Sequence, residues 1–161
     1  MQIRHKNREI YFREQAECTQ KYVIPYIEQV LSIQPHLRVL EIGCGEGGNL
    51  KPFLNIGCHC VGIDIDAAQL EKAKAFFANH SLNNNLRLIA NDIYKVSPNE
   101  IGAFDLIILR DVIEHLPNQE RFMHQLKCFM HSESIVFFGF PVWCNPFGGH
   151  QQICRNKWLS H

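Results

Sequence analysis

Apolar residues gather in five short, nearly continuous runs, which alternate with stretches of helical or polar pattern. The runs predict strands at 37–42, 60–65, 86–90, 105–109 and 134–140. A strand that is covered on both faces reads as a continuous apolar run, because neither side of it meets water. Parallel sheets with helices on both faces bury their strands in this way. The pattern therefore predicts an α/β fold with a mostly parallel sheet flanked by helices.

Apolar positions three or four residues apart predict the helices of this fold. They indicate three helices after the first strand, at 49–56, 66–79 and 118–130. Asp66 and Asn118 begin the second and third of these helices as N-caps. Residues 8–31 have the same periodicity, and Pro25 predicts a division into two helices ahead of the sheet. Two polar segments are predicted to be loops, at 79–85 and 97–102.

A glycine-rich turn joins the first predicted strand to the next helix. Glycine lets the backbone approach a ligand without a Cβ in the way, and α/β sheets bind nucleotides at this kind of strand-to-helix switch. The dinucleotide template G-x-G-x-x-G matches Gly43, Gly45 and Gly48. A second template, E-x-G-x-G-x-G, matches Glu41, Gly43, Gly45 and Gly47. The glycines alone leave both cofactor classes open.

Charge on the turn separates the two cofactor classes. A dinucleotide places a pyrophosphate there, whereas S-adenosylmethionine places an ammonium and a sulfonium there and carries no phosphate. Glu41 and Glu46 suit cations, and no Lys or Arg of the turn precedes Lys51. Two negative charges 4 Å apart repel by about 4 kcal/mol at an effective dielectric constant near 20. The turn therefore favours S-adenosylmethionine.

Four motifs in chain order resemble the class I, Rossmann-like S-adenosylmethionine-dependent methyltransferases. They are VLEIGCGEG, VGIDID, LIANDI and FDLIILRDVIEHLPN, and the resemblance covers residues 34–140. It implies a doubly wound sheet and S-adenosylmethionine as the cofactor. The family sheet has seven strands, of which the last two form an antiparallel pair. A chain with five predicted strands is therefore expected to be truncated after the fifth.

The 161 residues fit a single methyltransferase domain. We interpret 1–33 as N-terminal helices, 34–140 as the cofactor-binding core and 141–161 as the incomplete start of an acceptor-side region. In that last region Trp143 and Phe147 could form walls for a planar or apolar acceptor.

Candidate cofactor ligands follow the first two strands. Asp64 ends the second strand about 20 residues after the glycine turn, where an acid can accept both ribose hydroxyls. Because Asp66 already caps the next helix, Asp64 is available for this role, and Ile65 is predicted to flank the adenine. Glu41 ends the first strand and is predicted to hold the methionine ammonium through water.

The resemblance implies further cofactor contacts after the third and fourth strands. Asn91, Asp92 and Ile93 match positions where a family acid bonds the adenine amino group and an apolar neighbour packs on the ring. The backbone at Arg110 is expected to line the cofactor. His115 is a candidate general base by residue type, but its E-H-L string resembles family packing behind the cofactor, so no catalytic residue is assigned.

Composition narrows the partners and the compartment. Lys plus Arg and Asp plus Glu number 16 each, so nothing suggests a field that would hold nucleic acid. Seven cysteines form neither a disulfide framework nor a metal-binding spacing, which favours a reducing cytoplasm and free, mostly buried thiols at Cys44, Cys58, Cys60 and Cys128. No export signal or membrane-spanning run is expected.

Together these observations predict methyl transfer from S-adenosylmethionine to an unidentified small-molecule acceptor. A nicotinamide-dependent oxidoreductase remains the alternative in another reaction class, with Gly43, Gly45, Gly48 and Asp64 holding a dinucleotide. A cofactor-binding remnant without catalysis is a third interpretation. The oligomeric state does not follow from the pattern.

Overall fold

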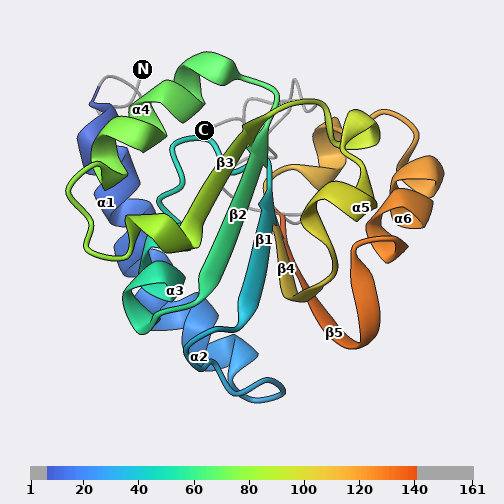
Figure 1. Ribbon diagram of the computed structural model, residues 1–161, viewed down its shortest axis with the longest axis horizontal. Coiled ribbons are helices and arrows are strands. Elements are labelled where there is room, and N and C mark those ends of the chain that lie inside the picture. Colours follow the sequence, from blue (N-terminus) through green and yellow to red (C-terminus); the bar gives the residue numbers. More distant parts are fainter. Residues whose placement is uncertain (1–6, 141–161) are drawn as a thin grey trace, which may run out of the picture.

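The computed structural model of the chain describes residues 7–140, which form a five-stranded sheet between two layers of helices (Figure 1). The strands are β1 (Arg38–Ile42), β2 (His59–Asp64), β3 (Leu86–Ala90), β4 (Phe104–Arg110) and β5 (Met130–Gly139). All neighbours pair in parallel, in the order β3-β2-β1-β4-β5. Because the order reverses between β1 and β4, the ends of these two strands flank the crevice where such sheets bind ligands. The predicted Rossmann-like, doubly wound sheet is confirmed.

The helices are divided between the two faces of the sheet (Figure 1). One face is covered by α1 (Arg8–Cys18), α2 (Ile24–Ile27), α3 (Leu50–Ile56) and α4 (Ala67–Phe77). The other face is covered by α5 (Pro98–Ile101) and α6 (Gln119–Lys127). Short 3-10 turns occur at η3 (Asn83–Asn85), η4 (Ile93–Lys95) and η5 (Ile113–His115). Asp66 and Asn118 cap α4 and α6 through their side chains, as predicted.

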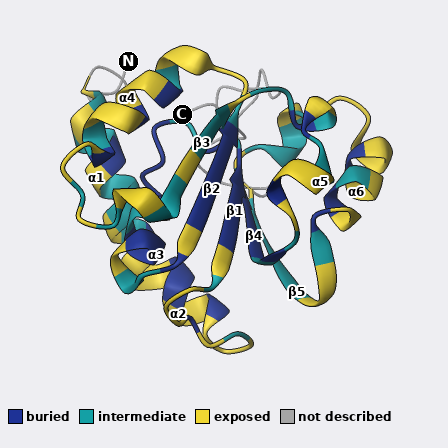
Figure 2. Ribbon diagram, viewed as in Figure 1, coloured by how far each residue is buried: buried dark blue, intermediate teal, exposed yellow. Residues whose placement is uncertain are grey.

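Alternation along the central strands builds two hydrophobic cores. Val39, Leu106 and Ile108 pack toward α1, α2 and α3, whereas Leu40 and Ile107 pack toward α5 and α6. Successive side chains of a strand point to opposite faces, so a strand covered on both faces must be apolar at nearly every position. The buried colour along β1, β2 and β4 in Figure 2 shows this. It explains why these strands are visible in the sequence as continuous runs.

The N-terminal helices are joined without an interruption, in contrast to the predicted break. A π-helical segment, η2 (Thr19–Val23), connects α1 directly to α2. Pro25, which has no amide N–H to donate to the preceding turn, lies just after this π-helical segment. A π turn changes the hydrogen-bond register by one residue, and the Ile24 amide accordingly donates to the Thr19 carbonyl. The proline is thus accommodated by a local change of helix type.

One predicted loop and several boundaries also differ from the sequence prediction. The predicted loop 97–102 contains α5, a single turn that buries Ile101 and is too short for a periodic pattern. α6 ends at Lys127, not at the predicted 130. β5 begins at Met130, four residues before the predicted start, which was missed because residues 131–133 are exposed and polar. β2 ends at Asp64, which leaves Ile65 outside the strand. Among residues 7–140 no helix has the length and apolarity needed to cross a bilayer.

Candidate functional site

The glycine turn after β1 has left-handed backbone at three positions. The φ angles are +71° at Gly43, +53° at Gly45 and +78° at Gly47. These are the three glycines of the E-x-G-x-G-x-G template. Gly48, which would complete the dinucleotide template, is absent from the positive-φ residues; a Cβ on Gly48 would lie 2.7 Å from the carbonyl oxygen of Phe12 in α1. Gly48 is therefore explained by close packing of α1.

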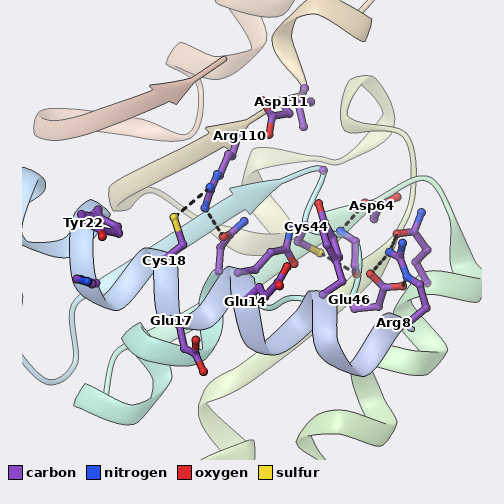
Figure 3. A pocket seen from close by; sticks show the side chains of 18 residues that line it. Arg8, Glu14, Glu17, Cys18, Tyr22, Cys44, Glu46, Asp64, Arg110 and Asp111 are labelled. Atoms are coloured by element: carbon purple, nitrogen blue, oxygen red, sulfur yellow. Dashed lines mark hydrogen bonds and ion pairs between the residues drawn. The ribbon is translucent and has the colours of Figure 1, made fainter. Parts of the chain in front are cut away.

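A cavity of about 900 Å³ lies beside this turn (Figure 3). One wall is formed by α1 and η2, and the other by the glycine turn and the ends of β2 and β4. Four of the predicted site residues line it, namely Gly43, Gly45, Asp64 and Arg110. The other six do not, namely Glu41, Gly47, Ile65, Asn91, Asp92 and Ile93.

Asp64 connects the end of β2 to the glycine turn. Its Oδ2 accepts a hydrogen bond from the Gly45 amide at 2.7 Å, and its Oδ1 accepts one from the Asp66 amide at 2.8 Å. Asp66 caps α4 by accepting from the Ala68 amide at 2.9 Å. Asp64 therefore has a structural role that the sequence interpretation missed. A carboxylate oxygen accepts more than one bond, so both oxygens keep capacity for ligand hydroxyls.

Glu41 is buried just beneath the cavity, with only 1% of its surface exposed. Asn49 donates to its Oε1 at 2.7 Å, while Oε2 is buried with no hydrogen-bond partner in the described part of the chain. Burial raises the pKa of Glu41 to about 8, although the hydrogen bond from Asn49 and the charge of Arg110 act in the opposite direction. Glu41 therefore carries a proton at neutral pH when no ligand is bound.

We expect this buried carboxyl to make stability depend on pH. Between pH 4.5 and about 8 the folded state retains a proton that the unfolded state has released. The free energy of unfolding should then fall as pH rises through that window, by up to about 1.4 kcal/mol per pH unit, and level off above it. Urea denaturation of wild type and Glu41→Gln at pH 6, 7 and 8 measures this. Parallel pH profiles for the two proteins would contradict it.

Glu46 does not offer a free charge to a ligand. It is buried, and Arg8 of α1 holds it with two hydrogen bonds, from Nε to Oε1 at 2.6 Å and from Nη2 to Oε2. The pairing residue lies 38 positions away in the sequence, so the charge argument could not include it. With Glu46 neutralised and Glu41 protonated, the turn by itself distinguishes cofactors less than its sequence suggests.

The residues after β3 have mainly local roles in this structure. Asp92 Oδ1 accepts from the Tyr94 amide at 3.0 Å, and Asn91 Oδ1 accepts from the Asp92 amide at 2.9 Å. Ile93 is 5% exposed and packs in the core on the α5–α6 side. Ile65, in contrast, is 78% exposed beside Asp64, a position from which it could cover a ligand ring. Their predicted contacts with adenine stay predictions.

Arg110 points its side chain along the cavity toward α1 (Figure 3). Nη1 donates to Asn49 Oδ1 at 3.0 Å, and Nη2 donates to Cys18 Sγ at 3.3 Å. The sequence analysis expected only the backbone here. Strand alternation could have predicted the direction of the Arg110 side chain. Arg110 lies on the same face of β4 as Leu106 and Ile108, which is the face that α1 covers.

Several α1 and η2 residues complete the cavity and were not assigned a role from sequence. Tyr11 and Tyr22 line it, although aromatic residues at helical spacing usually belong to a core. Arg8 lies over the Tyr11 ring, 4.9 Å from its centroid, and Lys21 lies over the Tyr22 ring at 5.1 Å. α1 therefore provides a polar and aromatic wall. Trp143, Phe147 and the rest of 141–161 lie outside the described residues.

Among residues 7–140, three of the five thiols are buried, and one prediction needs correction. Cys44, Cys58 and Cys60 are buried, and burial raises the pKa of Cys58 to about 11, but Cys128 is exposed at the end of α6. Cys128 was expected inside a core element; the helix ends one residue earlier, at Lys127. Within residues 7–140, no group of three or more His, Cys, Asp or Glu side chains could hold a metal ion.

Comparison with known proteins agrees with this geometry. The family model described as "Methyltransferase domain" matches residues 12–147. A ubiquinone biosynthesis O-methyltransferase of Rhodopseudomonas palustris is 30% identical over 106 residues, covering 66% of this chain and 40% of that protein. A sterol 24-C-methyltransferase of Gibberella zeae is 25% identical over 119 residues, covering 73% and 30%. The chain thus spans less than half the length of these relatives.

Solved structures share the fold. A sarcosine dimethylglycine methyltransferase from Galdieria sulphuraria superposes with a TM-score of 0.68 at 16% identity, over 74% of this chain and 44% of that one. PKMT2 from Rickettsia typhi, solved in complex with AdoHcy, gives 0.61 at 25% identity, over 73% and 24%. The family model covers well over half of the residues, and the chain therefore belongs to the methyltransferase domain family, whose class I members use S-adenosylmethionine.

Proposed function

We propose that this chain binds S-adenosylmethionine across the glycine turn and transfers its methyl group to a small-molecule acceptor. The observation that carries the proposal is the position of Asp64 at the cavity, hydrogen-bonded to the left-handed turn at Gly45. A ribose bound to the Asp64 carboxylate would lie next to the glycine turn, which has no side chains at Gly43, Gly45 and Gly47. The turn and the acid thus fit a nucleoside with an extended 5′ substituent.

The charged side chains of the whole cavity favour S-adenosylmethionine, beyond what the two acids of the glycine turn indicate. Five carboxylate side chains line the cavity, from Glu14, Glu17, Glu46, Asp64 and Asp111. Three cationic side chains line it, from Arg8, Lys21 and Arg110. S-adenosylmethionine carries a sulfonium, an ammonium and one carboxylate, so its net charge is positive. A pyrophosphate would meet an excess of negative charge and be disfavoured.

Methyl transfer asks little acid–base chemistry of the protein. Bound S-adenosylmethionine supplies a methyl group that is already activated by its sulfonium. The chain's contribution is to hold the donor on Asp64 and the turn, and to keep water from the donor with the wall formed by α1. Orientation and water exclusion can supply much of the acceleration of such a displacement. This is consistent with a site in which no catalytic side chain stands out.

For the methyl acceptor we propose only a chemical class, not a particular molecule. The relatives with ubiquinone and sterol names are methyltransferases of small molecules, one named for O-methylation and one for C-methylation. We propose a small, uncharged or weakly charged acceptor, which agrees with the balanced charge of the chain. Close packing at Gly48 is compatible with either glycine template, so the charge of the cavity, and not the glycines, disfavours the dinucleotide alternative.

Calorimetric titration with S-adenosylhomocysteine, with NADH as the parallel ligand, tests the proposal. We expect saturable one-to-one binding of S-adenosylhomocysteine and no binding of NADH, because only the former lacks phosphate. Binding of NADH alone would support the oxidoreductase alternative and contradict the proposal. Binding of S-adenosylhomocysteine without turnover across a panel of phenolic, sterol and amine acceptors would favour the cofactor-binding remnant.

A further inference from the structure

Arg110 is a cation in the cavity that the cofactor-binding scheme has not used. Among residues 7–140 it has no carboxylate partner within 4 Å, and its two side-chain hydrogen bonds go to the neutral groups of Asn49 and Cys18. The other two cations are engaged, because Arg8 pairs with Glu46 and Lys21 lies on Tyr22. A guanidinium has five donors, so Arg110 can still bind an anion.

The sheet places Arg110 at the far end of the turn from Asp64. β2 and β4 lie on opposite sides of β1, with Ile63 and Leu109 both aligned to Ile42. Extending these registers by one residue places Gly43 between Asp64 and Arg110. A ligand that rests its ribose on Asp64 and crosses the turn therefore directs its 5′ substituent toward Arg110. The 5′ substituent of S-adenosylmethionine ends in an amino acid.

The surroundings of Arg110 are built for an extended side chain. Arg110 is aligned with Gly139 of β5, and a Cβ on Gly139 would lie 3.3 Å from Arg110 Cγ. The absence of a side chain there leaves room for the guanidinium to lie toward α1 (Figure 3). Its charge also acts on the buried Glu41 carboxyl, which shares Asn49 as a hydrogen-bond partner. A cationic side chain that lines the cavity and a buried carboxyl outside its lining are thus linked through Asn49.

We infer that the Arg110 guanidinium binds the carboxylate of the cofactor's amino-acid end, with the ammonium of that end directed toward Glu41. The inference rests on the proposed function and adds a residue that selects for the intact amino acid. Arginine matches a carboxylate with two parallel N–H donors, which a lysine cannot reproduce. The side chain, and not only the backbone at this position, would then determine cofactor affinity.

The test compares S-adenosylhomocysteine with its decarboxylated analogue, 5′-deoxy-5′-(3-aminopropylthio)adenosine, which lacks only the carboxylate. We expect wild type to bind S-adenosylhomocysteine at least about tenfold more tightly than the analogue, since a hydrogen bond to a charged group typically contributes this much. Arg110→Met should remove this preference by weakening S-adenosylhomocysteine about tenfold or more, with less than about threefold effect on the analogue. Arg110→Lys should recover part of it.

Other outcomes separate this inference from the proposed function. An equal loss for both ligands in Arg110→Met, or no preference in wild type, would overturn the carboxylate assignment while leaving the donor site intact. Binding of neither ligand by wild type would contradict the proposed function and the assignment with it. Asn118→Ala, which changes an N-cap of α6 outside the cavity, serves as a control and should retain the preference.

Discussion

Replacing Asp64 with alanine is expected to weaken S-adenosylhomocysteine binding by about 100-fold or more. The carboxylate lies at the cavity and has free acceptor capacity for both ribose hydroxyls. Each hydrogen bond to a charged group contributes about 1.5–3 kcal/mol, and about 1.4 kcal/mol corresponds to a factor of ten. Calorimetric titration of wild type and Asp64→Ala measures the change directly.

Two further variants show whether the loss comes from the ligand or from the turn. Asp64→Asn keeps the shape and one carbonyl oxygen that can accept from Gly45, but its NH2 group would face the Asp66 amide. It should therefore retain the fold with a stability loss of about 1–3 kcal/mol and still weaken binding about tenfold. Asp66→Ala removes a carboxylate two residues away that caps α4 outside the cavity. It should cost about 1 kcal/mol of stability and leave the affinity within about twofold. Equal affinities for wild type and Asp64→Ala would remove the ribose role.

Replacing Gly43 with alanine is expected to lower the free energy of unfolding by about 2–5 kcal/mol. A left-handed conformation costs an alanine about 1–2 kcal/mol, and Gly43 has φ +71°. The new Cβ would also lie 2.4 Å from Val112 Cγ2, which must move. Overpacking of this kind typically costs about 1–3 kcal/mol more. Chemical denaturation of wild type and variant gives the difference.

A double variant isolates the steric part of this cost. Val112→Ala removes the methyl groups that the new Cβ would meet, so Gly43→Ala should cost less in its presence than in wild type. Gly45→Ala is the matched backbone control, because Gly45 has φ +53° and its Cβ would meet only the end of the Gln69 side chain at 3.0 Å. Equal losses at positions 43 and 45, without recovery in the double variant, would show that the contact with Val112 is unimportant.

Local pattern was sufficient for most of the sheet and for the caps. β3 was predicted with its observed bounds, and Asp66 and Asn118 were identified as N-caps from residue type and position alone. β5 was predicted too short because residues 131–133 are exposed and polar, so they separate Met130 from the apolar run that begins at Ile135. α5 was missed for a different reason, because a single turn of four residues is too short to show a helical period.

In the site, too, local features were predictable from sequence and long-range contacts were not. Glycines in a turn and an acid at the end of a strand are local features, so the turn and the place of Asp64 beside it followed from sequence. The cofactor class followed from the four ordered motifs. The pairing of Arg8 with Glu46 and of Arg110 with Asn49 joins residues 38 and 61 positions apart. Such contacts depend on how α1 packs across the strands, which no local pattern encodes. The sequence alone determined the glycine turn and the acid at the end of β2 that line the cavity. Only the tertiary structure decided which charges around them remain unpaired, because pairing and burial are properties of residues brought together by folding.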